Sequence, residues 1–194
     1  MLLTKKKVSI GLLTLALLAG GTSYYSLVYN KVTTIVGYER VVPYNDLQSL
    51  EKNAEIILIA TPTNDFEGRD HKATYFPGGK SSNTIQDAYT LTNIKVQKVI
   101  KSNGEVSEDK TIKVIEPVGL IQEITGKKKL TVDDYSEMEK GKKYVVFLKK
   151  NTQGQYSIMS SAYGKYNLDN ADTKDTTDIQ NRENIKKEIK SKYQ

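Results

Sequence analysis

The chain has 194 residues with a formal charge of +6, and it contains 13 tyrosines, one histidine and no cysteine. Without cysteine there is no disulfide, no thiolate zinc site and no cysteine nucleophile. Lysines at positions 5–7 carry half of the net charge, and no stretch interleaves arginine with aromatic residues, which argues against a nucleic-acid surface.

The N-terminal residues have the pattern of an export signal. Lysines at positions 5–7 precede an apolar run from Val8 to Ala19. Small residues at 19–23 offer a cleavage site. The alternative is a retained anchor, because the uncharged segment continues to Val28 and approaches the roughly 20 residues that cross a bilayer. We therefore predict residues 1–29 to be a signal peptide or a single transmembrane helix, with the rest outside the membrane. An anchor would place three aromatic residues at the outer interface: Tyr24, Tyr25 and Tyr29.

The exported part is predicted to begin with a strand and a short helix. Residues 31–42, KVTTIVGYERVV, are rich in β-branched residues, as strands are. In residues 44–55, YNDLQSLEKNAE, Asn45 is placed to cap a helix. Its apolar face has three members: Leu47, Leu50 and Ala54. Residues 55–62, EIILIATP, are a continuous apolar run that predicts a strand buried on both faces.

Residues 64–83, NDFEGRDHKATYFPGGKSSN, predict a long loop, and such loops are usually functional or disordered. A hairpin follows. Residues 88–102 alternate, with one side exposed to water. One side has Thr90, Thr92, Ile94, Val96 and Ile100, and the other has Leu91, Asn93, Lys95 and Gln97. The turn signal Asn103-Gly104 leads to a second strand at 111–117.

Two further strands are predicted, at 144–148 and from Tyr156 to about Tyr166, with turns at Lys140-Gly141 and Gln153-Gly154. Residues 169–194 are predicted to form a polar spacer and a marginal C-terminal helix. These elements predict a mainly β fold with one or two short helices, an antiparallel barrel or sandwich over residues 30–168, with an OB-like barrel as one form.

Three segments carry a resemblance to a known group of proteins. They are GKKYVVFLKK (141–150), QYSIMSSAYGKYNL (155–168) and, upstream, YTLTNIKVQKVIKS (89–102). Over about residues 45–168 the chain resembles uncharacterised small exported or membrane-anchored β domains of Gram-positive bacteria. The resemblance implies a fold and an extracytoplasmic location, and it carries over no catalytic or binding residue.

The 64–83 loop contains the residues that an enzyme or a metal site would need. His71 is the only histidine, so a Ser-His-Asp arrangement would use it, with Ser81 or Ser82 as nucleophile. Neither serine stands in a G-x-S-x-G context, and we assign no catalytic residue and no cofactor. Clustered carboxylates favour hard cations such as Ca²⁺, although the spacing is not that of an EF-hand. The candidate metal ligands are Asp65, Glu67, Asp70 and His71.

Tyrosines of the later strands offer a binding face if they share one side of the sheet, where rings stack on sugars or bases. The candidate binding residues are Tyr144, Tyr156, Tyr163 and Tyr166. We predict a non-enzymatic, membrane-tethered or secreted protein that binds a protein partner or an envelope component. The alternatives are a secreted or surface hydrolase that uses the 64–83 loop and an immunity-type inhibitor. The oligomeric state is not indicated.

Overall fold

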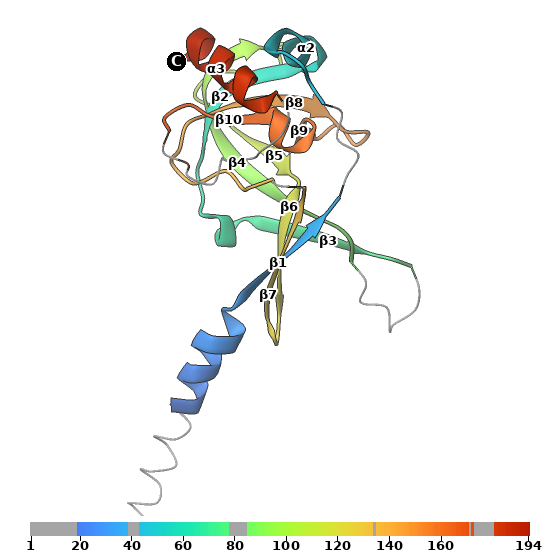
Figure 1. Ribbon diagram of the computed structural model, residues 1–194, viewed down its shortest axis with the longest axis vertical. Coiled ribbons are helices and arrows are strands. Elements are labelled where there is room, and N and C mark those ends of the chain that lie inside the picture. The colour runs from blue at the N-terminus through green and yellow to red at the C-terminus, as the bar shows by residue number, and fades with distance from the viewer. Residues whose placement is uncertain (1–18, 39–42, 78–84, 134, 171, 173–180) are drawn as a thin grey trace, which may run out of the picture.

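The computed structural model describes residues 19–38, 43–77, 85–133, 135–170, 172 and 181–194. The fold is mainly β, as predicted, with helical segments at both ends of the chain (Figure 1). Residues 19–24 are helical and continue into the first named element. The elements in chain order are η1 (Tyr25–Tyr29), β1 (Val32–Gly37), α2 (Leu47–Asn53), β2 (Ile56–Pro62), η2 (Phe66–Gly68), β3 (Asp70–Tyr75), β4 (Ile85–Lys101), β5 (Thr111–Glu116), β6 (Val118–Glu123), β7 (Gly126–Val132), β8 (Tyr144–Lys150), β9 (Tyr156–Ile158), η3 (Ser161–Gly164), β10 (Lys165–Asn167) and α3 (Arg182–Tyr193).

Five strands close into a barrel in the order β2-β4-β5-β9-β8, and β8 pairs with β2 to complete the circle. The barrel is mixed and not purely antiparallel. The expectation of an antiparallel barrel is wrong at one seam, because β5 and β9 are parallel, with Val114 opposite Tyr156 and Ile115 opposite Ser157. β9 pairs antiparallel with β8 on its other side, and this hairpin orients it parallel to β5.

β2 separates two apolar layers, which explains its continuous apolar sequence. Successive strand residues point to opposite faces. Ile56 and Leu58 pack inside the barrel, whereas Ile57 and Ile59 pack outward against the helices. β8 follows the same rule, since Val146 lies inside the barrel.

Helices α2 and α3 cover the outward layer at the end of the molecule where the C-terminus lies (Figure 1). α2 is capped by Asp46, whose Oδ1 accepts the Ser49 N–H at 2.7 Å, so the prediction of Asn45 as the cap is wrong by one residue. α3 is a docked part of the domain, because Ile185 and Ile189 are fully buried against this layer.

β4 confirms the predicted alternation as far as Gln97, but Ile100, predicted on the side of Ile94, packs against the other apolar layer, beyond register shifts in the pairing with β2. Thr90, Thr92, Ile94 and Val96 are buried, and the intervening side chains from Asn93 to Gln97 are exposed. The predicted loop at 64–83 is wrong in part, since β3 within it pairs antiparallel with the first half of β4. Its remaining residues 78–84, which include Ser81 and Ser82, lie outside the described residues.

A second sheet of three strands, β1-β7-β6, extends from the barrel toward the N-terminal helical segment (Figure 1). β1 pairs parallel with β7, and β6 and β7 form an antiparallel hairpin that the sequence had not predicted. Among the described residues, no helix combines the length and the apolar character needed to span a bilayer. Residues 1–18, which hold most of the predicted leader, lie outside the described part of the chain, as do most residues of the predicted spacer, 173–180.

Candidate functional site

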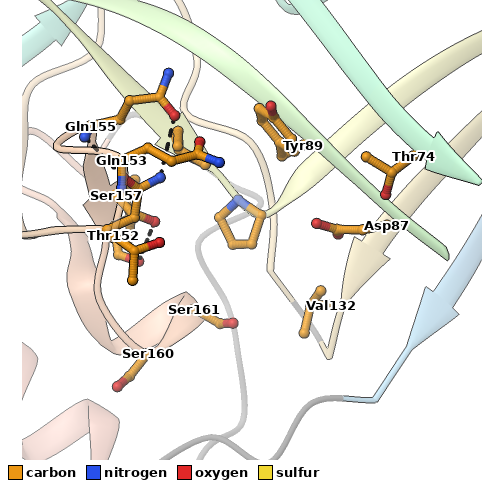
Figure 2. A pocket seen from close by; sticks show the side chains of 14 residues that line it. Thr74, Asp87, Tyr89, Val132, Thr152, Gln153, Gln155, Ser157, Ser160 and Ser161 are labelled. Atoms are coloured by element: carbon orange, nitrogen blue, oxygen red, sulfur yellow. Dashed lines mark hydrogen bonds between the residues drawn. The ribbon is translucent and has the colours of Figure 1, made fainter.

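A polar cleft of about 810 Å³ lies on the outer surface of the barrel, where β5 meets β9. Figure 2 shows its walls: the loop between β8 and β9 on one side, and the paired strands β3 and β4 on the other. The lining residues are Thr74, Asp87, Tyr89, Ile115, Pro117, Val132, Asn151, Thr152, Gln153, Gln155, Ser157, Ile158, Ser160 and Ser161.

The strand wall follows from the alternation of β4. From Ala88 to Val96 the even-numbered residues of this strand are buried, so Asp87 and Tyr89 point outward together. Thr74 on β3 is the register partner of Asp87 and shares its face, and Ile115 on β5 is the partner of Leu91, two positions further along. A ring, a carboxylate and a hydroxyl therefore stand on one wall (Figure 2).

The loop wall is organised by Asn151. Its Oδ1 accepts the backbone N–H groups of Gln153 at 3.0 Å and Gln155 at 2.9 Å. Gly154 completes the turn with a φ of +78°, a conformation that favours glycine. The predicted turn at Gln153-Gly154 is thus confirmed, and it holds the amide side chains of this loop beside the cleft before any ligand arrives.

The floor of the cleft ends in a strained turn. Ser160 and Ser161 have φ values of +44° and +49°, in the left-handed region that non-glycine residues seldom adopt. A Cβ on Gly164 would lie 2.3 Å from the carbonyl oxygen of Met159, so only glycine permits this tight return. The predicted strand from Tyr156 to Tyr166 is therefore divided into β9, η3 and β10.

Ser161 is the most informative residue of the cleft. Its side chain is 4% exposed, and its hydroxyl has no hydrogen-bond partner, although buried polar groups are nearly always paired. The oxygen itself is buried, and in Figure 2 it is directed toward the other lining side chains, whereas that of Ser160 is directed away from them. Strain of this kind concentrates at functional sites.

The chemistry of the lining is neutral and polar. It contains hydroxyl and amide side chains and one carboxylate, Asp87, and it contains neither lysine nor arginine. Such a lining offers hydrogen bonds to a ligand that carries hydroxyl or amide groups and little charge. Apart from the turn at Gln153-Gly154, the sequence alone had not identified these residues.

The tyrosines predicted to bind a ligand do not form a shared exposed face. Tyr144, Tyr163 and Tyr166 are 0%, 1% and 0% exposed and pack in the two apolar layers. Tyr144 donates a hydrogen bond to Asp172, and burial, followed by this bond, raises its pKa well above the ordinary value. Tyr156 is half-buried and donates a hydrogen bond to Glu105.

The four candidate metal ligands are not brought together. Asp65 pairs with Lys140, Glu67 with Lys127, and Asp70 with Lys72, each in a separate ion pair. No group of three or more acidic, histidine or cysteine side chains in the described parts of the chain is arranged to hold a metal ion.

His71 is held as a neutral ring. Its Nε2 lies 2.9 Å from the carbonyl oxygen of Phe66, which can only accept, and its Nδ1 lies 2.8 Å from the Thr90 hydroxyl and accepts the backbone N–H of Leu120 at 3.3 Å. Burial is the main cause that lowers the pKa of His71 below its ordinary value of 6.5. Both nitrogens are engaged within the protein, so neither is available as a general base.

This environment makes stability depend on pH. As the pH falls through 6.5, the unfolded chain takes up a proton on His71 before the folded chain does, so the free energy of unfolding decreases. We expect the stability difference between wild type and His71→Gln to shrink on acidification from about pH 7.5 to about pH 5, measured by urea unfolding. A difference that stays constant over this range would contradict the assigned protonation state.

A buried ion pair joins the β2–β3 connection to the barrel. The Arg69 guanidinium lies 2.7 Å from Glu116 Oε1, and the two side chains are 1% and 0% exposed. Glu116 Oε2 also accepts the Tyr135 hydroxyl and the Met138 N–H, both at 2.8 Å. Every group in this network is paired, which indicates a structural role.

A scan of protein-family models matches none of them to this chain, and a search of curated proteins finds no similar sequence.

Proposed function

We propose that the protein is a non-enzymatic, extracytoplasmic binding module that is tethered to the membrane and holds an uncharged, hydroxyl-rich segment of an envelope glycan in the polar cleft. The observation that carries this proposal is the Ser161 hydroxyl, which is buried at the cleft without a partner. A buried hydroxyl without a hydrogen bond costs about 1–3 kcal/mol, and a rotation of the Ser161 side chain that lets it pair with a ligand in the cleft recovers this cost.

The topology of the barrel supports the choice of cleft. Numbered by chain order, the five barrel strands follow each other as 1-2-3-5-4, with the third and fifth parallel. We interpret this order as OB-like. OB-fold barrels bind oligosaccharides and oligonucleotides on the face of strands 2 and 3, between the loops that follow strands 1 and 4. The cleft has the same position, over β4 and β5 and beside the β8–β9 loop.

The charge of the lining favours a glycan over a nucleic acid. Binding of nucleic acid depends largely on lysine and arginine at phosphates, and the lining has neither. A carboxylate such as Asp87 would repel a phosphate backbone, whereas it accepts hydrogen bonds from sugar hydroxyls. The half-buried Tyr89 ring offers a surface on which a sugar can stack.

Membrane attachment is proposed from the N-terminal sequence. Lysines at positions 5–7 and the apolar run from Val8 to Ala19 have the composition of an export segment, and the positive-inside bias places the domain after this run on the outer side. The hydrolase alternative would need His71 as its general base, and both ring nitrogens of this residue already have hydrogen-bond partners within the protein.

Ser161→Gly tests the proposal with a matched control. Glycine suits a φ of +49° and removes the unpaired hydroxyl, so the variant is expected to unfold at the same or a higher temperature than wild type. Its affinity for a tetramer of N-acetylglucosamine, measured by isothermal titration calorimetry on the full chain, is expected to fall roughly 5- to 150-fold, which corresponds to about 1–3 kcal/mol for the hydroxyl that the ligand would pair.

Ser160→Gly is the control, because it relieves similar backbone strain at a φ of +44° while its hydroxyl points away from the cleft. Its affinity should equal that of wild type. If the tetramer does not bind, or if both glycine variants bind it as wild type does, the cleft does not bind glycans through Ser161.

A further inference from the structure

The hairpin of β6 and β7 extends beside the N-terminal helical segment, far from α3 (Figure 1). Three contacts join its turn to this segment. Gln122 Nε2 donates to the carbonyl oxygen of Tyr29 at 3.1 Å, Tyr24 donates its hydroxyl to the carbonyl of Ile124, and Lys127 N–H donates to the carbonyl of Lys31 at 2.7 Å. The turn is therefore fixed relative to the helix.

Gly126 shows how close this approach is. A Cβ at this position would lie 2.7 Å from the carbonyl oxygen of Lys31 and 3.0 Å from that of Val28, and its φ is +128°. Only glycine fits such a backbone conformation at such a distance. The hairpin turn thus packs backbone to backbone on the end of the helical segment.

The turn and the helical segment both expose apolar side chains. Ile124 is 81% exposed and Leu27 is 72% exposed, although the described part of the domain buries most other large apolar residues. The rings of Tyr25 and Tyr29, in the same helical segment as Leu27, stack with their centroids 5.7 Å apart. Tyrosine rings are favoured where hydrocarbon meets water at a membrane surface.

The position of Ile124 along the helix can be compared with membrane dimensions. An anchor of about 20 residues that starts at Val8 ends near Val28, four residues after Tyr24, which contacts Ile124. At 1.5 Å per residue this separation is about 6 Å. With such an anchor, Ile124 lies close to the boundary between the headgroups and the hydrocarbon.

The lysines of the hairpin are balanced by neighbouring glutamates. Lys127 pairs with Glu67, Lys128 with Glu123 and Lys129 with Glu137. Lys31, just before β1, adds one positive charge beside the turn. The exposed apolar side chains, and not the net charge, therefore indicate what this tip contacts.

We propose that the tip of the β6–β7 hairpin, led by the exposed Ile124, inserts into the interfacial layer of the membrane and gives the domain a second contact beside its N-terminal anchor. This inference rests on the membrane attachment proposed above. Two contacts fix the orientation of the domain, because a single helix leaves it free to rotate and tilt.

The absence of tryptophan from the sequence gives a direct test. Ile124→Trp, Leu27→Trp and Ser191→Trp each create a full chain with one fluorescent reporter: at the hairpin tip, at the anchor and on the exposed side of α3, respectively. Each is reconstituted into vesicles of phosphatidylcholine and phosphatidylglycerol, with and without doxyl-labelled lipid. The Ile124→Trp emission is expected to shift to shorter wavelength and to be quenched by the doxyl lipid, as for Leu27→Trp, while Ser191→Trp is not quenched.

The outcomes separate the two proposals. Quenching of Leu27→Trp without quenching of Ile124→Trp would keep the anchor and overturn the hairpin contact. If neither reporter is quenched beyond the level of Ser191→Trp, the membrane attachment itself is overturned, and the hairpin contact with it.

Discussion

Replacing Glu116 with leucine is expected to lower the free energy of unfolding by about 3–5 kcal/mol, the cost of leaving one member of a buried ion pair without its partner. The carboxylate is fully buried and pairs with Arg69, the Tyr135 hydroxyl and the Met138 N–H. Without it, the guanidinium keeps only neutral acceptors, which are the carbonyls of Asn64 and Met138 and the Thr92 hydroxyl. A buried charge in this position is strongly destabilising.

Urea unfolding of the full chain measures this effect, with an exposed ion pair as the control. Lys140 and Asp65 form a pair in which both side chains are more than half exposed, so Lys140→Met should change stability by about 0.5 kcal/mol or less. Arg69→Met combined with Glu116→Leu should recover part of the loss, because it removes the uncompensated charge. A cost of Glu116→Leu no larger than that of Lys140→Met would disprove the importance of the network.

The second large effect is expected at the C-terminal helix, where Ile189→Ala should destabilise the protein by about 2–5 kcal/mol. Ile189 is fully buried in the layer that also contains Leu50 of α2 and Phe147 of β8. Alanine would leave a cavity between the helix and the barrel. The loss is the transfer free energy of the missing methyl groups plus the cost of that cavity.

Glu188→Ala is the matched control, because the neighbouring side chain is exposed and alanine favours helices. It should change stability by about 0.5 kcal/mol or less. Thermal unfolding and the loss of helical circular dichroism compare the two variants. If Ile189→Ala unfolds at the same temperature as Glu188→Ala, the packing of α3 contributes little to the stability of the domain.

The elements that the sequence predicted best are those whose pattern is local. β4 alternates between core and solvent, and the apolar run of β2 follows from its position between two layers. The helix at Leu47–Asn53 was predicted from its apolar spacing. Each of these patterns is contained within a single segment, so it can be recognised without knowledge of the partner.

Features that depend on distant partners could not be predicted. β7 begins with Gly126 and three lysines, a polar pattern, and it is a strand because it lies between β1 and β6. Arg69 finds Glu116 across 47 positions of the chain. Tyrosine is common both in binding faces and in cores, so the sequence could not distinguish the two. Tyr163 and Tyr166 are buried because α2 and α3 pack over the layer that contains them.

The cleft was accessible to sequence analysis only through its loop. A turn at Gln153-Gly154 was predicted, but a turn motif does not indicate which strand lies opposite. The strained pair Ser160 and Ser161 contains no glycine, so nothing in the sequence marked the left-handed conformation. The binding site arises from the way β9 returns to β5.

The pairing of β5 with β9 is also the shortest strand pairing in the barrel. Only two residue pairs connect β5 to β9, whereas β5 and β4 are joined by six. We therefore expect the barrel to open most easily between β5 and β9. The cleft lies across this pairing, with Ile115 of β5 on one side and Ser157 of β9 on the other. A ligand bound in the cleft would contact both strands and hold them together. Ligand binding would therefore stabilise the closed barrel, and the closed barrel would favour ligand binding.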